Sequence, residues 1–321
     1  MKTSAKSEVV NGKSLATMRG EIVFPCFMPV TTFGGKYPLD EVLRPYLHRF
    51  APAFMVSHYY ALNMEKQERP QHPLFIDSGG FASLFEGTEM LEYGELTCLR
   101  TKDGTELHPA EVLSFQEENA DIGATLDFLI SPSMTLDEAK RRQALTIKNA
   151  LWAAKHRANR DMRLFASLQC WDGESARRIT GELAEQDFDG FSLGGMVPRV
   201  RDPRLIFEIV EAIREVDGTR PLHVFGIGSP GLMRALFERG VDSADSSSFL
   251  QQTVKKQYLH PDRNEFVPLE EVGRPSDVCG CRVCKTFEMD YLRLEGELNN
   301  MALALHNLAV LNAMVGIRHV S

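Results

Sequence analysis

The chain has 321 residues, a net charge of −8 and six cysteines. No apolar run reaches the roughly 18 residues that a membrane span needs, and the first residues lead into no signal-peptide core. The acidic balance excludes a general polyanion binder. Three cysteines (Cys26, Cys98, Cys170) are scattered, which favours a reducing compartment over a disulfide framework. We therefore expect a cytoplasmic protein with no membrane partner.

Short apolar segments that end in small or polar residues alternate with amphipathic helical segments. The apolar segments are typical of strands buried on both faces of a parallel sheet. The predicted strands are 26–31, 53–57, 74–77, 124–130, 164–169, 190–193, 222–227 and 241–245. The predicted helices are 39–50, 109–119, 136–160, 173–186, 203–216 and 229–239. Eight such strands with crossover helices predict an α/β fold of the (β/α)8 TIM barrel type.

The alternation stops after Asp245, which divides the chain into two predicted parts. We expect residues 1–249 to form the barrel, with a β-hairpin insertion near 95–108 that turns at Asp103-Gly104. Residues 250–321 are expected to form a C-terminal zinc-binding subdomain, closed by a long helix over 291–315.

The zinc prediction depends on three cysteines within six residues. Cys279, Cys281 and Cys284 are followed by His306 on an apolar helical segment. Three thiolates and one imidazole complete the tetrahedral shell of a structural zinc, with no open position for water. Two alternatives remain from the residues alone. The cysteines can be a redox pair or a chance cluster, and His306 can be a packed core residue.

Polar residues follow the carboxyl ends of the predicted strands. An isolated Asp at such a position is often a helix cap. Six positions that converge on one rim of a barrel instead predict a shared pocket, because barrel enzymes assemble their sites there. Three carboxylates, without a Ser-His-Asp or catalytic-metal pattern, indicate chemistry at a sugar carbon. The positions are Asp77, Asp127, Gln169, Gly194-Gly195, Gly226-Ile227-Gly228 and Asp245.

Five blocks then point to a family. They are Asp77-Ser78-Gly79-Gly80-Phe81, Ser192–Met196, Phe225–Pro230, Gly240–Ser246 and the cysteine cluster with His306, preceded by Phe24–Thr31. In this order they resemble the tRNA-guanine transglycosylase family, including its DNA-modifying 7-deazaguanine relatives. The resemblance runs from about residue 20 to 310. Members exchange a guanine in nucleic acid for a free 7-deazaguanine base.

The resemblance implies a role for each matching residue. Asp245 is the expected nucleophile on C1′ of the target nucleotide, and Asp77 the expected acid and base. Asp127 is expected to bind the N1–H and 2-amino edge of a guanine-type base. Phe81 and Phe225 match the positions that sandwich the base, although ordinary barrel packing is their alternative explanation. The base-binding set is completed by Ser78, Gln169, Gly194 and Gly195, and the structural zinc by Cys279, Cys281, Cys284 and His306.

Departures from the family pattern leave two possible nucleic-acid substrates, tRNA and DNA. A Ser-rich stretch over 246–252 replaces the Pro-Thr-Arg element of bacterial tRNA enzymes, and Ser57-His58-Tyr59-Tyr60 replaces the usual Asn-Thr-Phe-His. The chain ends 15 residues after His306, without the RNA-binding domain of archaeal members. We expect tRNA, the commoner substrate of the family, with DNA as the alternative. The incoming base (queuine, preQ1 or preQ0) stays open. Family members commonly dimerise, so a homodimer is one expected assembly.

A basic segment suggests where a polymer binds. Residues 140–163 carry eight Lys or Arg side chains and one acidic residue. We expect this helix outside the barrel, with some of its charges near Lys255, Lys256 and Arg282, as a track for phosphates. A solvated helix face is the alternative.

Two other function classes were weighed against base exchange. One is a non-catalytic subunit that binds nucleic acid or a partner, which has no need of three carboxylates. The other is a zinc deaminase, which needs a His-x-Glu element that this sequence lacks.

Overall fold

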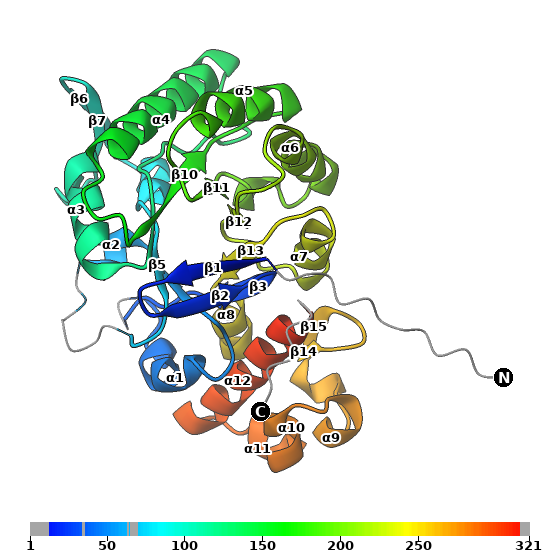
Figure 1. Cartoon of the computed structure of the whole chain (residues 1–321). Helices are drawn as coiled ribbons and strands as arrows, with labels where there is room; N and C mark the ends of the chain where they lie inside the picture. The colour runs from blue at the N-terminus through cyan, green and yellow to red at the C-terminus, as the bar shows by residue number, and fades with distance from the viewer. Residues whose placement is uncertain (1–12, 34–35, 63, 65–69, 315–321) are drawn as a thin grey trace.

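The computed structural model describes residues 13–33, 36–62, 64 and 70–314, and it has a barrel at its centre (Figure 1). Eight parallel strands form one sheet in the order β3-β13-β12-β11-β10-β9-β5-β4. A bridge between Val30 and Met55 joins the two outer strands, with Thr31 N donating to Met55 O at 2.8 Å. The predicted TIM barrel is confirmed. Its strands are Cys26–Pro29, Phe54–Val56, Leu74–Ile76, Ile122–Ala124, Arg163–Leu168, Gly190–Leu193, Leu222–Val224 and Ser243–Ser246, in chain order.

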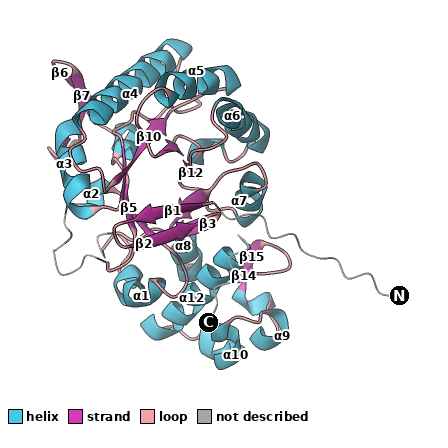
Figure 2. Ribbon diagram, viewed as in Figure 1, coloured by secondary structure: helices cyan, strands magenta, loops and turns pink. Residues whose placement is uncertain are grey.

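Helices cover the outside of this sheet (Figure 2). A proline is the first residue of three helices, where a backbone N–H would have no acceptor within the helix. These residues are Pro109, Pro203 and Pro230. Asp172 caps α5 by accepting a hydrogen bond from Ser175 N at 2.8 Å. The helices are α1 Leu39–Leu47, α2 His58–Ala61, α3 Pro109–Asn119, α4 Leu136–His156, α5 Gly173–Ala184, α6 Pro203–Val216, α7 Pro230–Phe237 and α8 Ser248–Val254.

Apolar side chains fill the barrel interior below the carboxyl ends of the strands. Phe75, Phe165 and Met28 are each at most 1% exposed within this cluster. A hairpin that the sequence analysis did not predict, β1 Ser14–Thr17 and β2 Gly20–Val23, packs Leu15 and Ile22 against the same cluster. Arg19 of its turn pairs with buried Asp121, just before β9, at 2.5 Å. The opposite end of the barrel stays open for a site.

The predicted hairpin insertion is present and larger than expected. β7 Leu96–Arg100 pairs with β8 Glu106–Leu107, and also with β6 Glu89–Tyr93, which the sequence analysis left out. Asp103 shapes the turn between β7 and β8 by accepting from Thr105 N at 3.1 Å.

The C-terminal region packs on one side of the barrel and shares its core. Buried Leu303 and Leu308 belong to the same apolar cluster as Leu43 and Phe27 of the barrel. The expected division at residue 249 stays a prediction, and α8 runs across this position. The region contains β14 Gln257–His260, β15 Glu265–Pro268, α9 Pro275–Val278, α10 Arg282–Thr286, α11 Met289–Arg293 and α12 Glu297–Met314.

Several predicted elements are shorter in the structure than expected, and two need a larger correction. The strand expected over 124–130 is β9 at Ile122–Ala124, and residues 125–130 continue as a fully buried loop. The closing helix expected over 291–315 is split into α11 and α12, because Gly296 has a φ of 146° that a helix does not allow. Residue 315 lies outside the described part of the chain.

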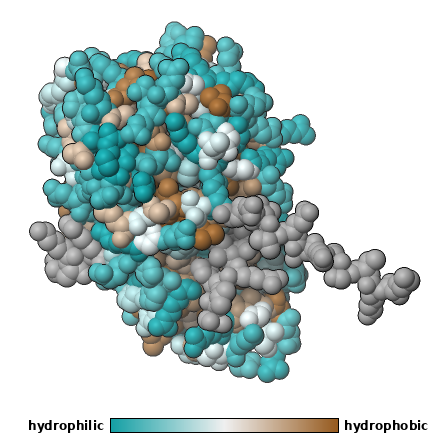
Figure 3. Space-filling view, viewed as in Figure 1, coloured by the Kyte–Doolittle hydropathy of each residue, from teal (hydrophilic) through white to brown (hydrophobic). Residues whose placement is uncertain are grey.

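The surface also corrects one expectation. α4, which holds residues 140–156 of the basic segment, lies at the far end of the molecule from α9 and α10 (Figure 1). This part of the segment is therefore away from the zinc-binding region that it was expected to approach. The visible face over α4 to α6 is mainly hydrophilic (Figure 3). Among the described helices, none has the length and apolar character to cross a membrane.

Candidate active site

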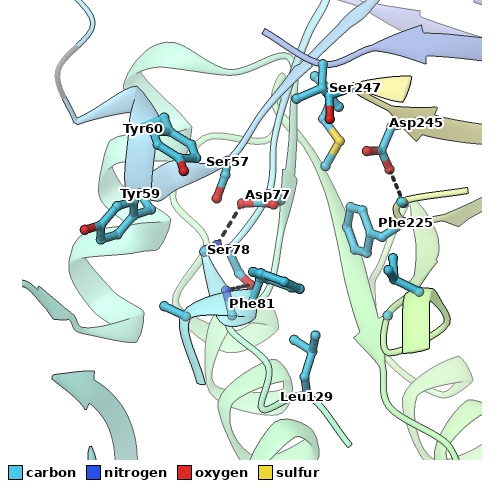
Figure 4. A pocket seen from close by; sticks show the side chains of 18 of the residues that line it. Ser57, Tyr59, Tyr60, Asp77, Ser78, Phe81, Leu129, Phe225, Asp245 and Ser247 are labelled. Atoms are coloured by element: carbon cyan, nitrogen blue, oxygen red, sulfur yellow. Dashed lines mark hydrogen bonds between the residues drawn. The ribbon is translucent and has the colours of Figure 1, made fainter. Parts of the chain in front are cut away.

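A cavity of about 320 Å³ lies at the carboxyl ends of the barrel strands. Loops after seven of the eight strands line it, and β10 is the exception. Asp77, Asp127 and Asp245 all reach this one cavity. Figure 4 places Asp77 with Ser57 and Phe81 on one side, and Asp245 with Phe225 and Ser247 on the other.

Asp77 follows β5 and is held by the backbone around it. Its Oδ1 accepts from His58 N at 3.0 Å and from Gly79 N at 2.7 Å. Burial raises the pKa of Asp77 to about 7, against the opposing effect of these hydrogen bonds. A carboxyl group with this pKa can both give and take a proton near neutral pH.

Asp127 lies in the buried loop after β9, and side chains fix both of its oxygens. Ser78 Oγ donates to Oδ1 at 2.8 Å, and Gln169 Nε2 donates to Oδ2 at 2.5 Å. Gln169 is itself held, because its Oε1 accepts from Ile130 N at 3.1 Å. Burial raises the pKa of Asp127, while both side-chain hydrogen bonds oppose that rise. The carboxyl group therefore faces the cavity in one orientation.

Glycines let the loops approach Asp127 this closely. A Cβ on Gly80 would lie 2.0 Å from Asp127 Oδ1, and a Cβ on Gly194 would lie 2.2 Å from Gln169 Nε2. Neither position has room for any other residue. The Gly-Gly pairs of the sequence thus pack directly against the acceptor.

Asp245 is on β13, and its described hydrogen bonds all involve one carboxylate oxygen, Oδ1. Oδ1 accepts from Gly226 N at 3.0 Å and contacts His223 Nε2 at 3.1 Å. His223 Nδ1 contacts Ser243 Oγ at 2.9 Å. Among the described residues, none donates a hydrogen bond to Asp245 Oδ2, so this oxygen is the one available to an incoming atom.

The tautomer of His223 follows from these contacts. His223 is completely buried on β12, and its ring contacts the rings of Phe75 and Phe225, with 4.9 and 4.8 Å between ring centres. An ionised carboxylate can only accept, so the Nε2 proton points to Asp245. In a neutral imidazole Nδ1 then accepts from the hydroxyl of Ser243. The hydrogen bonds therefore run from the Ser243 hydroxyl to His223, and from His223 to Asp245.

Phe81 and Phe225 both line the cavity (Figure 4). Phe81 is 48% exposed, so it is not packed into the barrel core. Phe225 packs partly on Phe75, at 5.8 Å between ring centres. The two rings offer flat surfaces to a planar ligand.

A second cluster lies away from the cavity, in the C-terminal region. One ligand atom from each of Cys279, Cys281, Cys284 and His306 lies within 4.8 Å of the others. Tetrahedral bonds of about 2.3 Å to sulfur and 2.0–2.1 Å to nitrogen place those atoms about 3.5 Å apart. His306 Nδ1 is 3.4 Å from Cys281 Sγ and 3.2 Å from Cys284 Sγ. The four residues can hold a metal ion.

Neighbouring groups orient these four residues. His306 Nε2 lies 3.0 Å from Leu259 O, which leaves Nδ1 free to bind a metal. The Tyr258 ring stacks on His306 at 3.8 Å, and its hydroxyl lies 3.3 Å from Cys284 Sγ. These contacts orient His306 toward the cysteines, so they favour a metal ligand over a packed core residue.

Comparison with known proteins agrees with this geometry. The family model described as queuine tRNA-ribosyltransferase matches residues 12–319. The chain belongs to this family. It is 27% identical to the tRNA-guanine(15) transglycosylase of Pyrococcus furiosus, over 94% of this chain and 49% of that protein. It is 25% identical to the protein of the same name from Methanosphaera stadtmanae, over 92% of this chain and 42% of that protein. It is also 25% identical to the one from Thermococcus kodakarensis, over 94% of this chain and 50% of that protein. The chain spans about half the length of these relatives.

Most of the residues predicted for a transglycosylase site share the cavity. Gln169 differs, because it is fully buried behind Asp127 and does not line the cavity. It positions Asp127 and does not itself face a ligand. The lining includes Asp77, Ser78, Phe81, Asp127, Gly194, Gly195, Phe225 and Asp245.

The three predicted nucleic-acid residues lie outside the cavity lining. Lys255 and Arg282 are exposed. The Lys256 ammonium group instead donates to Leu294 O and to Asn300 Oδ1, both at 2.8 Å, and so connects β14 to α12. Among the described residues that line the cavity, Lys36 is the one with a cationic side chain.

Sequence reasoning missed two groups at this candidate site. His223 was read as part of an apolar strand, although a histidine between Leu222 and Val224 was a usable signal. Arg199, only 5% exposed, donates to Ile130 O at 2.6 Å and to Gly195 O at 2.5 Å. It fixes the loop after β11 against the loop after β9, and nothing in its local sequence marks it.

Proposed function

We propose that this chain is a pentosyltransferase that exchanges a guanine in tRNA for a free 7-deazaguanine base. The observation that carries the proposal is the different environment of three carboxyl groups in one cavity. One has an open oxygen, one has a pKa near neutrality, and one is fixed as an acceptor. These are the three properties that base exchange requires.

The first half of the reaction removes guanine. Asp245 Oδ2 attacks C1′ of the target nucleotide, and the bond between C1′ and the guanine nitrogen breaks. The bonding electrons stay on the leaving base, which takes a proton from Asp77. The products are a glycosyl ester on Asp245, ionised Asp77 and neutral guanine.

The second half reverses these steps with a different base. Ionised Asp77 takes the proton from the ring nitrogen of the incoming 7-deazaguanine, and that nitrogen attacks C1′. The bond from C1′ to Oδ2 breaks and returns the electron pair to Asp245. Asp77 is protonated again, so the cycle is balanced without any co-reactant.

Base selection is assigned to Asp127. Guanine and 7-deazaguanines present N–H donors at N1 and the 2-amino group, which match a carboxylate acceptor. Adenine lacks matching donors there and leaves the carboxylate unpaired at a large cost. Phe81 and Phe225 hold the base flat after it is extruded from the polymer.

The metal site has a structural role in this proposal. Cys279, Cys281, Cys284 and His306 hold one zinc ion in a closed shell, which stabilises the fold of the C-terminal region. The cluster is separate from the cavity lining, so the metal takes no part in base exchange.

The test is incubation with radiolabelled guanine and either tRNA or duplex DNA. We expect label in tRNA, and a covalent adduct that survives denaturing electrophoresis with wild type but not with Asp245→Asn. Label in DNA alone would instead identify the DNA-modifying relatives as the functional match. Label in neither polymer, without an adduct, would favour a non-catalytic subunit.

A further inference from the structure

Four aromatic rings form a connected row beside the catalytic carboxyl groups. Tyr60 packs edge-on against Tyr59 at 5.4 Å, Tyr59 against Phe85 at 6.1 Å, and Phe85 against Phe81 at 5.7 Å. All four line the same cavity. Phe81 and Phe85 are 48% and 40% exposed. Phe81 is assigned to the exchanged base, which leaves three rings without a ligand.

The hairpin insertion fixes the orientation of this row. The Tyr59 hydroxyl donates to Asp103 Oδ2 at 3.0 Å, across from the turn between β7 and β8. Asp103 is in turn held by Thr105 N and by the Thr101 hydroxyl. The hydrogen bond also raises the pKa of the Tyr59 phenol, so the hydroxyl stays a donor at neutral pH. A ring held by its far end keeps its face available to a ligand.

We propose that Tyr59, Tyr60 and Phe85 form a stacking subsite for the nucleotide next to the target, which is bound unpaired. This inference rests on the proposed base exchange and adds a second base-binding position to it. The row is continuous with Phe81, so it starts where the extruded base lies. The neighbouring base is the next planar group along the polymer.

The chemistry of the row favours a base over a phosphate. Among the described residues, three aromatic rings and no cation line this side, whereas Lys36 and Gln251 lie among the other lining residues. Gln251 Nε2 donates to the Tyr37 hydroxyl at 3.0 Å. Rings stack on any base without reading its identity. A base that is paired in a duplex cannot present its face to them. The subsite therefore selects loops and single strands.

The experiment uses a short single-stranded RNA with one guanine and a 2-aminopurine on either side of it. Fluorescence of 2-aminopurine is quenched when it stacks on a ring. Stacking contributes about 1–3 kcal/mol per base, so Tyr59→Leu should weaken RNA binding by roughly 5- to 150-fold and abolish the quenching. Tyr59→Phe keeps the ring but loses the hydrogen bond to Asp103, so it should keep the quenching and lose less affinity than Tyr59→Leu. Tyr93→Leu is the matched control, because Tyr93 is 46% exposed nearby on β6 but does not line the cavity.

The outcomes separate this inference from the proposed function. Exchange of radiolabelled guanine by wild type is measured first, and its absence in every protein overturns both. If wild type exchanges guanine and Tyr59→Leu equals wild type in RNA binding and in quenching, the stacking subsite is overturned and the proposed function stands. If Tyr59→Leu does not fold, Phe85→Leu removes the neighbouring ring and should give the same loss. Equal affinity for the RNA and for its paired duplex would also overturn the proposal.

Discussion

The hydrogen bonds of Asp245 indicate which half of the reaction His223 assists. A hydrogen bond to an ionised carboxylate is stronger than one to the carbonyl oxygen of an ester. In the proposed exchange, His223 and Gly226 N, which both contact Oδ1, would therefore stabilise the carboxylate when it leaves the sugar. The same contacts orient Oδ2 for the first attack. His223 is a positioning residue, since it acts through Asp245.

We predict that His223→Leu slows breakdown of the covalent intermediate more than its formation. A hydrogen bond to a charged group contributes about 1.5–3 kcal/mol, so breakdown should slow by roughly 10- to 150-fold. The fraction of enzyme trapped as adduct should then rise, measured on denaturing gels and in single-turnover reactions. His223→Gln keeps an N–H donor and should partly restore breakdown. A proportional loss of both steps would indicate a purely structural residue.

Asp77 gives the reaction a defined pH dependence. Burial raises its pKa to about 7, so the carboxyl group is protonated below this pH and ionised above it. Adduct formation needs the protonated form, and its rate should fall by about tenfold per unit above pH 7. Asp77→Asn should be slow and independent of pH in the same range, whereas Asp137→Asn on α4 should follow wild type. A profile for Asp77→Asn that matches wild type would contradict the assignment.

The same shift has a consequence for stability. Because the folded pKa lies above the unfolded value, the folded state keeps a proton that the unfolded chain releases. Stability from this group is present below about pH 4 and is lost as the pH rises to about 7. The melting temperature of wild type should therefore fall relative to Asp77→Asn across this window.

At the level of elements, the loop after β11 packs against Gln169, which positions the proposed base-selecting Asp127. An alanine at Gly194 would place its Cβ 2.2 Å from Gln169 Nε2 and push the amide away from Asp127. We predict that Gly194→Ala lowers guanine incorporation by about 100-fold or more, because Asp127 loses its orientation. Gly181→Ala on α5 is the control, since a Cβ there meets nothing within 4 Å. Guanine incorporation equal to wild type in Gly194→Ala would show that the loop accommodates the methyl group.

The sequence predicted the bounds of an element well only where a local signal determines where the element begins or ends. The bounds of α3 and α6 were predicted correctly, because Pro109 and Pro203 mark their first turns. The strand over 124–130 was misplaced, because burial alone makes a loop apolar. Thr125 to Ile130 are all buried, but side chains bond part of this backbone, as in Thr146 Oγ1 with Phe128 N at 3.1 Å. No local pattern separates such a loop from a strand.

The candidate site was predictable where a motif marks it. The Asp and Gly positions at strand ends reach one cavity, as expected from barrel topology. His223 and Arg199 were missed, because their contacts are with residues 22 and 69 positions away. The row of Tyr59 and Phe85 depends on a hairpin whose docking the sequence does not encode locally. Long-range contacts of this kind need the folded structure.

For the whole molecule, the C-terminal region and the barrel share one apolar core. A metal bound by Cys279, Cys281, Cys284 and His306 would therefore stabilise both parts. We predict one zinc per chain by elemental analysis. Chelation or Cys281→Ser should lower the melting temperature and expose α12 first in hydrogen exchange. Cys98→Ser, a buried cysteine on β7 away from the cluster, is the control. Less than half an equivalent of zinc in protein purified without chelator would refute the assignment.

The polymer-binding face is the remaining property of the whole molecule. Lys255 and Arg282 are exposed on the C-terminal region, whereas Lys148 and Lys155 are exposed on α4 at the opposite end. Lys256 is left unchanged, because its hydrogen bonds to Leu294 and Asn300 make it structural. Each phosphate contact adds about 0.9 to the salt slope on duplex DNA and about 0.7 on a single strand.

We predict that reversing Lys255 and Arg282 to Glu weakens tRNA binding and reduces its dependence on salt. Reversing Lys148 and Lys155 to Glu changes the net charge of the protein by the same amount, so it separates a local contact from a general charge effect. This control should keep the slope of wild type, and free-base binding should be equal in all three proteins. Titrations of tRNA at several salt concentrations measure the slopes. Equal weakening by both double variants would show that overall charge, and not this face, attracts the polymer.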